Sequence, residues 1–204
     1  MKKETDEDNQ EEKMATNMTI RGHIDALLEI LGDNGTKIIF RNIGHLDIFE
    51  NQPGYDWEPC MTEDDRTEIY TEVVNMYGLK GALSLWRRMG YNAVKYPVEK
   101  GNVVDSFEKD LSPDEKYKKS MEFLCAVSGK GKILLNDEGK VEYDCFNCVT
   151  CAPYKTERPI CFGYVGSLQY LADWSYGKDV YIVKEIRCKA KGDDTCYFVL
   201  TENK

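Results

Sequence analysis

Six of the eight cysteines of this chain lie within its last 60 residues, at spacings typical of metal ligands. They are Cys145, Cys148, Cys151, Cys161, Cys188 and Cys196. Thiolates two residues apart, joined later in the chain by further thiolates, are the usual way in which a fold captures a soft cation. Glu185 stands three residues before Cys188 and adds a harder oxygen ligand on the same element. The sequence therefore predicts a metal centre in the C-terminal third of the chain.

Four of these donors are brought together if the chain forms a hairpin near its end. Glu185 and Cys188 stand near the end of one predicted strand and Cys196 at the start of its partner, so they converge across the turn. Strand alternation puts residues 185 and 188 on opposite faces, so we expect the strand to bend or end near Ile186. Cys161 opens the preceding helix and offers a fourth ligand. One Glu and three Cys make a closed tetrahedral site that suits structural zinc, and a thiol set that responds to oxidation is the alternative.

The triplet Cys145, Cys148 and Cys151 predicts a second metal or redox site, separate from the first. Bacterial ferredoxins hold a four-iron cluster with similar spacing, but their motif continues to a fourth cysteine and a proline. In this chain Cys125 or Cys60 would have to complete the set. A second zinc and a redox relay are the other interpretations. The spacing indicates a metal, and leaves open which metal.

Length and composition fit one globular domain. The 204 residues are 42% apolar, which is enough to bury a core. The net charge of −9 argues against nucleic acid as a direct partner, because phosphate binding requires a basic face. No apolar run approaches the roughly 20 residues of a membrane span, and the first residues do not resemble a signal peptide. We therefore expect a cytoplasmic protein, in which clustered cysteines bind metal or do redox chemistry. Cys60 and Cys125, each alone, are expected to be ordinary buried thiols.

The first half of the chain predicts a tail, three helices and a strand. Residues 1–17 are mostly charged or amide side chains without an apolar period, which predicts a disordered acidic tail. The expected elements after it are helices over residues 19–31, 62–77 and 80–89 and a strand over residues 36–41. Thr19 is expected to cap the first helix. Gly32, Gly78 and Gly90 are expected to end the three helices in turn.

The second half predicts one more helix and then a small sheet. Ser112 as cap and Pro113 at the first helical position begin a helix that runs to about residue 127. The elements expected after it are a hairpin over 132–136 and 140–144, a helix over 162–176, and strands over 180–186 and 196–200. Gly163 and Gly166 indicate that something packs closely against the first turn of that helix. The pattern predicts an α+β fold, with N-terminal helices and an antiparallel sheet, in a single domain over residues 18–204. The metal-binding part covers about 140–204.

The C-terminal pattern resembles that of the 4-vinyl reductase domain family, which includes the aromatic-sensing domains of phenol- and xylene-responsive transcription activators. Two segments carry the resemblance, Cys161-Phe-Gly-Tyr-Val-Gly166 and Val183-Lys-Glu-Ile-Arg-Cys-Lys-Ala-Lys-Gly-Asp-Asp-Thr-Cys-Tyr-Phe198. The resemblance is specific over about residues 145–200 and looser upstream. It implies an α+β fold like that of the vesicle-tethering complex subunits, with dimerisation through the N-terminal helices. It also implies a zinc site whose ligands fall on Cys161, Glu185, Cys188 and Cys196.

In the sensors of this family an apolar pocket near the metal binds small aromatic compounds. By analogy the resemblance implies pocket residues at Trp86, Phe123, Tyr164, Leu168, Tyr170 and Trp174. Ordinary core packing is the competing interpretation of these side chains. His23 and His45 are the only histidines, and the sequence assigns neither of them a role.

We therefore expect a zinc-containing domain that binds or senses an apolar or aromatic small molecule, as a homodimer. An iron–sulfur electron-transfer protein built on Cys145, Cys148 and Cys151 is the first alternative. A tetrapyrrole vinyl reductase, which the family name suggests, is the second, although no hydride-donor site is visible. Whether the protein is an enzyme stays open. The triplet is not part of the sensors' zinc site, and no DNA-binding or ATPase domain is expected in these residues.

Overall fold

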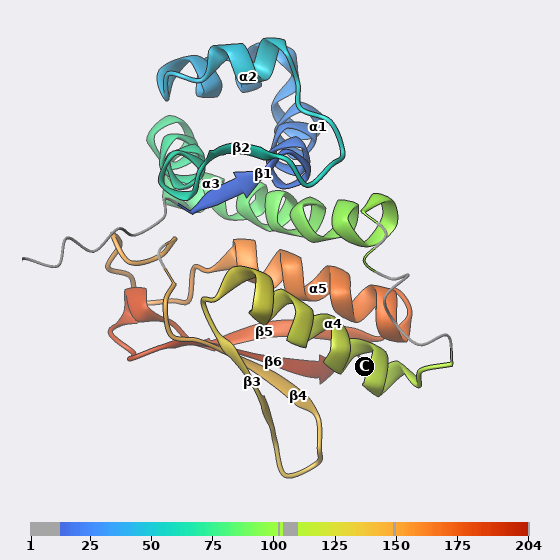
Figure 1. Ribbon diagram of the computed structural model, residues 1–204. Helices are drawn as coiled ribbons and strands as arrows, with labels where there is room; N and C mark the ends of the chain where they lie inside the picture. Colours follow the sequence, from blue (N-terminus) through green and yellow to red (C-terminus); the bar gives the residue numbers. More distant parts are fainter. Residues whose placement is uncertain (1–12, 102, 104–109, 149, 204) are drawn as a thin grey trace, which may run out of the picture.

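Two long helices, one short helix and a pair of short strands form the first half of the computed structural model, which describes residues 13–101, 103, 110–148 and 150–203 (Figure 1). These elements are β1 Met14–Thr16, α1 Asn17–Asn42, α2 Leu46–Glu50, β2 Pro59–Thr62 and α3 Glu63–Lys100. β1 pairs antiparallel with β2. The tail predicted over residues 1–17 lies outside the described residues up to residue 12. Its last part is not a tail, because strand pairing with β2 orders Met14–Thr16.

A four-stranded antiparallel sheet and two helices form the second half. The elements are α4 Pro113–Ser128, β3 Lys132–Leu135, β4 Val141–Cys145, α5 Phe162–Tyr176, β5 Tyr181–Arg187 and β6 Cys196–Glu202. The strand order is β3-β4-β6-β5. Figure 1 shows α5 between α3 and the sheet, so that α5 joins the two halves. Buried side chains of both halves belong to one hydrophobic core. The predicted α+β class is confirmed.

Hydroxyl side chains cap the longer helices at their N-termini. The Thr62 side chain accepts a hydrogen bond from the Asp65 N–H at 3.0 Å, at the predicted start of α3. Ser112 and Glu115 form a reciprocal capping box at the start of α4, with Pro113 in the first turn. The predicted cap of α1 is wrong by one turn, because Thr16 is the cap and accepts from the Thr19 N–H.

The strand predicted over residues 36–41 is wrong, because these residues continue α1 beyond a kink at Gly32. Gly32 has a φ of 66°, so the helix breaks there as expected and then resumes. Thr36, Ile39 and Phe40 are buried, which is the i, i+3, i+4 spacing of a helix face. A short apolar run rich in β-branched residues does not distinguish a strand from a buried helix segment.

The two glycines predicted to end helices in residues 62–90 behave differently. Gly78 has a φ of 68° and breaks the helical backbone, although the helix continues beyond it. Gly90 does not end the helix, which runs on to Lys100, so that prediction is wrong. Gly90 is helical and buried, and its missing side chain has a packing role instead.

The close contact of α3 with α5 depends on glycines in both helices. A Cβ atom on Gly90 would collide with the Gly163 carbonyl oxygen, and one on Gly166 would collide with the Arg87 carbonyl oxygen. The Ser167 hydroxyl donates a hydrogen bond of 2.9 Å to the Gly90 carbonyl across the same contact. The expectation that something packs closely against the first turn of α5 is therefore confirmed, and α3 is the element that does so.

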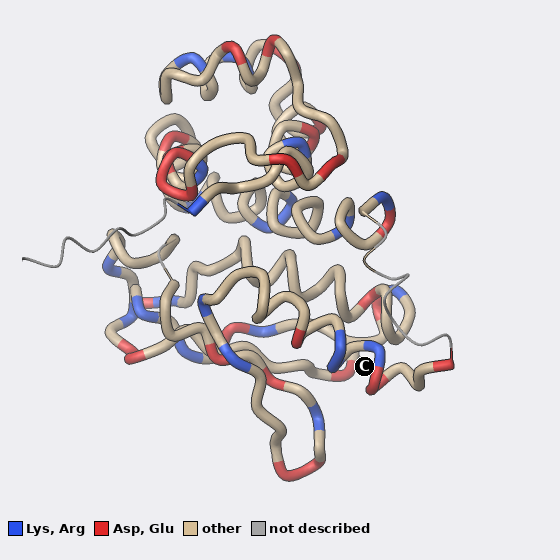
Figure 2. Tube along the Cα trace, viewed as in Figure 1, with Lys and Arg blue, Asp and Glu red and all other residues tan. Residues whose placement is uncertain are grey.

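The surface carries both signs of charge. Figure 2 shows basic and acidic residues interspersed along the described chain. Within the described residues, the search for a helix long and apolar enough to cross a membrane finds none.

We predict that Gly90→Ala and Gly166→Ala each destabilise the protein by about 3 kcal/mol or more, because the new methyl group meets backbone that cannot move aside. Urea unfolding followed by circular dichroism measures the change. Gly81→Ala is the matched control, because Gly81 is an exposed position in the same helix as Gly90 and alanine favours helix there. Equal stability of the Gly90 and Gly81 variants would contradict the proposed role of the contact.

Candidate metal centre and adjoining cavity

An irregularity in β5 turns Glu185 and Cys188 toward the same site. The β5–β6 register shifts between Glu185 and Arg187, so Ile186 is the extra residue of a bulge. β5 then ends at Arg187, directly before Cys188. This is the bend that the alternation of side chains required, and the expectation of a break near Ile186 is confirmed.

The other cysteines reach the site from three further elements. Cys161 is the residue before α5, and Cys196 begins β6. Cys145 ends β4 directly opposite Cys196 in the antiparallel register. Cys148 and Cys151 lie in the segment after β4, and all of these thiols are buried and free of disulfide bonds. The sheet register is therefore what carries the segment after β4 to the side of the final hairpin.

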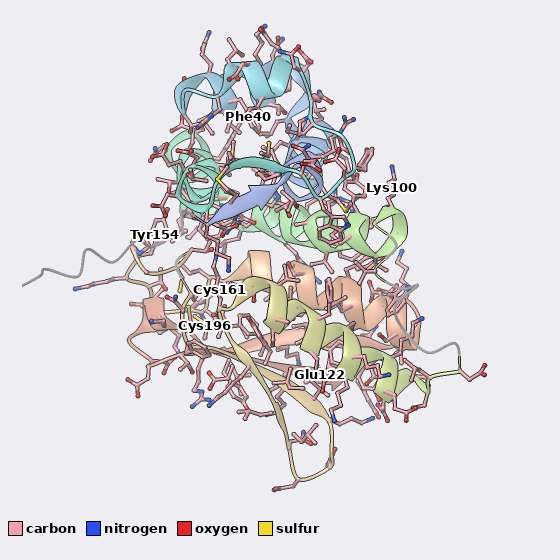
Figure 3. The ribbon with its side chains drawn as sticks, in the orientation of Figure 1. Phe40, Lys100, Glu122, Tyr154, Cys161 and Cys196 are labelled. Atoms are coloured by element: carbon pink, nitrogen blue, oxygen red, sulfur yellow. The ribbon has the colours of Figure 1, made fainter. Side chains whose placement is uncertain are left out.

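The structure brings six donors into two overlapping groups of four. One group is Cys161, Glu185, Cys188 and Cys196, and the other is Cys148, Cys151, Cys161 and Cys196. Within each group the ligand atoms lie within 4.8 Å of one another. The sequence predicted two separate sites, but the groups share Cys161 and Cys196, whose Sγ atoms are 3.5 Å apart (Figure 3).

The separations between sulfurs match a shared metal ion. Cys148 Sγ is 3.4 Å from Cys161 Sγ, and Cys151 Sγ is 3.4 Å from Cys196 Sγ. Cys188 Sγ is 3.9 Å from Cys161 Sγ. A tetrahedral zinc ion with bonds of about 2.3 Å to sulfur sets its ligand atoms about 3.8 Å apart. The donor types and their spacing therefore fit zinc in either group.

Cys145 belongs to the triplet in sequence but to neither group of four in space. Hydrogen bonding to Cys148, followed by burial, raises the pKa of Cys145 above its usual range. Cys60 and Cys125 are half-buried and also lie outside both groups. The triplet is thus divided, since two of its members join the donors from the final hairpin.

Negative charge in this site requires a compensating cation. Burial, reinforced by the neighbouring Cys188, raises the pKa of Glu185 to about 9. Glu185 Oε2 accepts a hydrogen bond of 2.8 Å from the Cys161 N–H, while Oε1 has no partner among the described residues. Hydrogen bonds to Cys148 and the other thiols raise the pKa of Cys161 far above its usual range. Buried thiolates at these distances repel one another, so a bound cation is the arrangement that makes them stable together.

A cavity of about 580 Å³ lies beside the metal centre, where α1, α3, α4 and α5 converge. Most of its lining is apolar, and α3, α4 and α5 supply Ala93, Val94, Val98, Phe123, Leu124 and Leu171. A volume of this size is in the range of pockets for small molecules and cofactors. The first turn of α5 connects the two features, because Gly163 and Tyr164 line the cavity and Cys161 is a metal-ligand candidate.

One end of the cavity is polar. Arg66 donates two hydrogen bonds to Glu63, and Lys130 Nζ donates a third to Glu63 Oε2 at 2.6 Å. Although burial acts to raise it, these two cations hold the pKa of Glu63 down at about 2. His23 also lines the cavity, and neither of its ring nitrogens has a partner among the described residues. Burial, assisted by Arg66, lowers the pKa of His23 to about 3, so its imidazole is neutral.

The pocket residues implied by the family resemblance are only partly cavity residues. Phe123 and Tyr164 line the cavity. Trp86 and Leu168 are core instead, and the Trp86 indole donates to the Tyr70 carbonyl at 3.2 Å. Tyr170 and Trp174 are not among the lining residues either. Leu171 takes the place expected for Leu168, because the cavity face of α5 runs through residues 163, 164, 167 and 171.

Sequence reasoning missed the polar end of the cavity. His45 pairs with Asp65 at 3.4 Å, whereas His23 is completely buried. The position of His23 beside the apolar stripe of the first helix was the one signal that could have indicated its burial. Glu63, Arg66 and Lys130 carried no such signal, because charged residues at helix starts and turns are ordinarily exposed.

The fold and the cysteine site together define a 4-vinyl reductase domain, since residues 141–202 match the model of that family. This confirms the resemblance for the part of the chain that holds β4, α5, β5, β6 and the clustered cysteines. A particular relative is the uncharacterized protein MJ0745 of Methanocaldococcus jannaschii, 30% identical over 92 residues. The match covers 45% of this chain and 49% of the relative, so it spans about half the length of that protein.

The whole fold is similar to solved H-NOX structures. An H-NOX protein from S. oneidensis in its Fe(II)NO state has a TM-score of 0.57 at 13% identity, with 93% of this chain and 100% of that chain covered. An oxygen-binding H-NOX domain related to soluble guanylate cyclases has a TM-score of 0.58 at 12% identity, with 93% and 96% covered. At these identities the likeness concerns the fold alone.

We predict that removing metal with a chelator in reducing, anaerobic buffer lowers the melting temperature by at least about 10 °C. The metal holds β6, the bulge of β5 and the start of α5 together, and each kcal/mol lost shifts the midpoint by about 2–4 °C in a chain of this size. Scanning calorimetry measures the shift. Zinc should restore the original value and calcium should not, because thiolates are soft ligands.

Thiol titration provides an internal control for this experiment. Cys60 and Cys125 are half-buried and lie outside the site, so their reactivity should be the same before and after chelation. The buried thiols should react only after chelation. An unchanged melting temperature together with unchanged thiol reactivity would argue that these cysteines hold no metal.

Proposed function

We propose that residues 18–204 form a single zinc-containing domain that binds or senses a small apolar or aromatic molecule. The observation that carries the proposal is the cavity of about 580 Å³, with an apolar lining and one polar end. The H-NOX proteins of similar fold are described in an Fe(II)NO state and as oxygen-binding, which supports a binding role for this arrangement of elements. The metal centre, in the part of the chain over about 140–204, then serves as structural support.

The apolar lining selects the body of the ligand. Transfer of apolar surface from water into such a cavity is favourable by roughly 25 cal/mol per Å² of buried surface. The polar end adds orientation, because Arg66 and Lys130 together carry one more positive charge than Glu63 balances. A neutral His23 with unpartnered nitrogens offers both a hydrogen-bond donor and an acceptor. A compact aromatic molecule with one polar substituent fits this lining.

The first turn of α5 provides a route from ligand to metal centre. Tyr164 lines the cavity, and burial followed by the neighbouring Cys145 raises the pKa of its hydroxyl well above the usual value. Cys161, three residues earlier, is shared by both donor groups. A ligand that moves Tyr164 therefore acts on the turn that the metal holds. This is the basis for a sensing role.

The iron–sulfur alternative receives less support from the geometry. A cluster places several iron and sulfide atoms between its cysteine ligands, and this forces their Sγ atoms further apart than one shared ion does. The separations of 3.4 to 3.9 Å between the clustered sulfurs suit single ions. The proposed metal is therefore zinc.

We predict that the neutral fluorescent probe N-phenyl-1-naphthylamine binds the cavity and that Val94→Trp weakens its binding by at least about tenfold. The indole would fill space between α3 and α4 that the probe needs. Fluorescence titration measures the affinity. Val180→Trp is the matched control, because Val180 is exposed and outside the cavity, and it should bind like the unchanged protein. Equal affinity of the two variants would place the probe elsewhere.

A tetrapyrrole is a second candidate ligand, favoured by one specific observation. His23 is the only cavity-lining histidine among the described residues, and its unpartnered nitrogens could ligate a haem iron. Arg66 and Lys130 could pair with the carboxylates of such a ligand. When bound, a haem iron would supply a site for a small gas. Reduction of a vinyl tetrapyrrole would use the same cavity.

The tetrapyrrole candidate predicts that added haem gives a stoichiometric absorption band in the unchanged protein and in His45→Ala, but not in His23→Ala. His45 is the matched control, because it lies at the surface beside Asp65. Absorption titration with ferrous and ferric haem measures this. Indistinguishable spectra for the two histidine variants would remove His23 as a ligand and leave the apolar-ligand proposal standing.

A homodimer formed through the N-terminal helices remains part of the proposal. Light scattering over a range of protein concentrations tests it directly.

A further inference from the structure

We propose that this chain binds two divalent ions, joined by Cys161 and Cys196 as bridging thiolates. The inference rests on the proposed metal site and extends it. The two groups of four donors are not alternatives placed side by side, because they share an edge made of these two sulfurs. That edge is 3.5 Å long.

The first ion would be held by the shared pair together with Glu185 and Cys188. Cys188 Sγ lies 3.9 Å from Cys161 Sγ, which is close to a tetrahedral edge. Glu185 contributes Oε1, a buried oxygen without a partner among the described residues. Its other oxygen accepts from the Cys161 N–H, which fixes the carboxylate in place. The Cys188 N–H donates to Asp193, which holds the second ligand.

The second ion would be held by the shared pair together with Cys148 and Cys151. The Sγ atoms of these two residues are 3.5 Å apart. Each lies 3.4 Å from a different member of the shared pair, Cys148 from Cys161 and Cys151 from Cys196. Four edges of this tetrahedron are therefore between 3.4 and 3.5 Å. The family resemblance gives these two cysteines no part in a zinc site, so their placement is a feature of this chain.

Donor number and charge both favour two ions over one. A tetrahedral ion uses four donors, so a single ion would leave two of the six buried and without a partner of opposite charge. Five thiolates and one carboxylate carry six negative charges, and two divalent ions compensate four of them. Each thiol that binds loses its proton to the solvent, and no oxidant or reductant takes part. A thiolate has more than one lone pair, so Cys161 and Cys196 can each bind both ions.

The test is the zinc content of the full-length protein, purified without oxygen and measured by elemental analysis and native mass spectrometry. We expect two zinc ions per chain. Cys148→Ser and Cys188→Ser should each retain one ion, and Cys161→Ala should lose both. Cys145→Ala is the matched control, because Cys145 belongs to the triplet by sequence and to neither group by geometry, and it should retain two.

Cobalt substitution keeps the proposal testable if a variant fails to fold. Two cobalt ions bridged by thiolates couple magnetically, so the magnetic moment per cobalt should fall when the second equivalent is added to the unchanged protein. A single ion per chain, or two uncoupled ions, would overturn the shared-thiolate pair and leave a metal-supported binding domain. Absence of bound metal, or iron with acid-labile sulfide, would overturn the zinc site of the proposed function as well.

Discussion

The first turn of α5 is the constraint on which the rest of this structure depends. Gly163 and Gly166 allow its backbone to touch the backbone of α3 at Gly90 and Arg87. The residue before the helix, Cys161, lies within 4.8 Å of donors from the segment after β4 and from the final hairpin. One turn of helix thus joins the helical part, the sheet and the cysteine site. A shift of this turn would disturb all three.

The chain places its most costly groups at this junction. Burying thiols, a carboxylate, two cations and a histidine is unfavourable unless each is compensated. The Arg66–Glu63–Lys130 cluster achieves this with direct ion pairs. The cysteine cluster requires a cation, and His23 and Glu185 retain unpartnered atoms. Uncompensated groups beside a cavity are the usual mark of a binding site, because folding alone gives no reason to keep them.

Local chemistry allowed much of the secondary structure to be predicted. Thr62 and Ser112 begin their helices because a hydroxyl satisfies a free N–H at a helix start. The bulge at Ile186 was required by the spacing of Glu185 and Cys188 alone. The errors came where a residue has two uses. Residues 36–41 fit a strand or a helix equally well, and Gly90 was taken as a helix end when it permits a close helix contact.

The sequence by itself determined the kind of chemistry, because soft thiolates and one carboxylate at short spacing suit a metal wherever they meet. It also determined the α+β class, through its caps, periods and turns. Only the tertiary structure decided which donors meet. The antiparallel pairing of β4 with β6 sets Cys145 opposite Cys196 and brings Cys148 and Cys151 to the hairpin ligands. Sheet register and helix packing are long-range properties, so cysteines that look like two sites along the chain form one cluster in space.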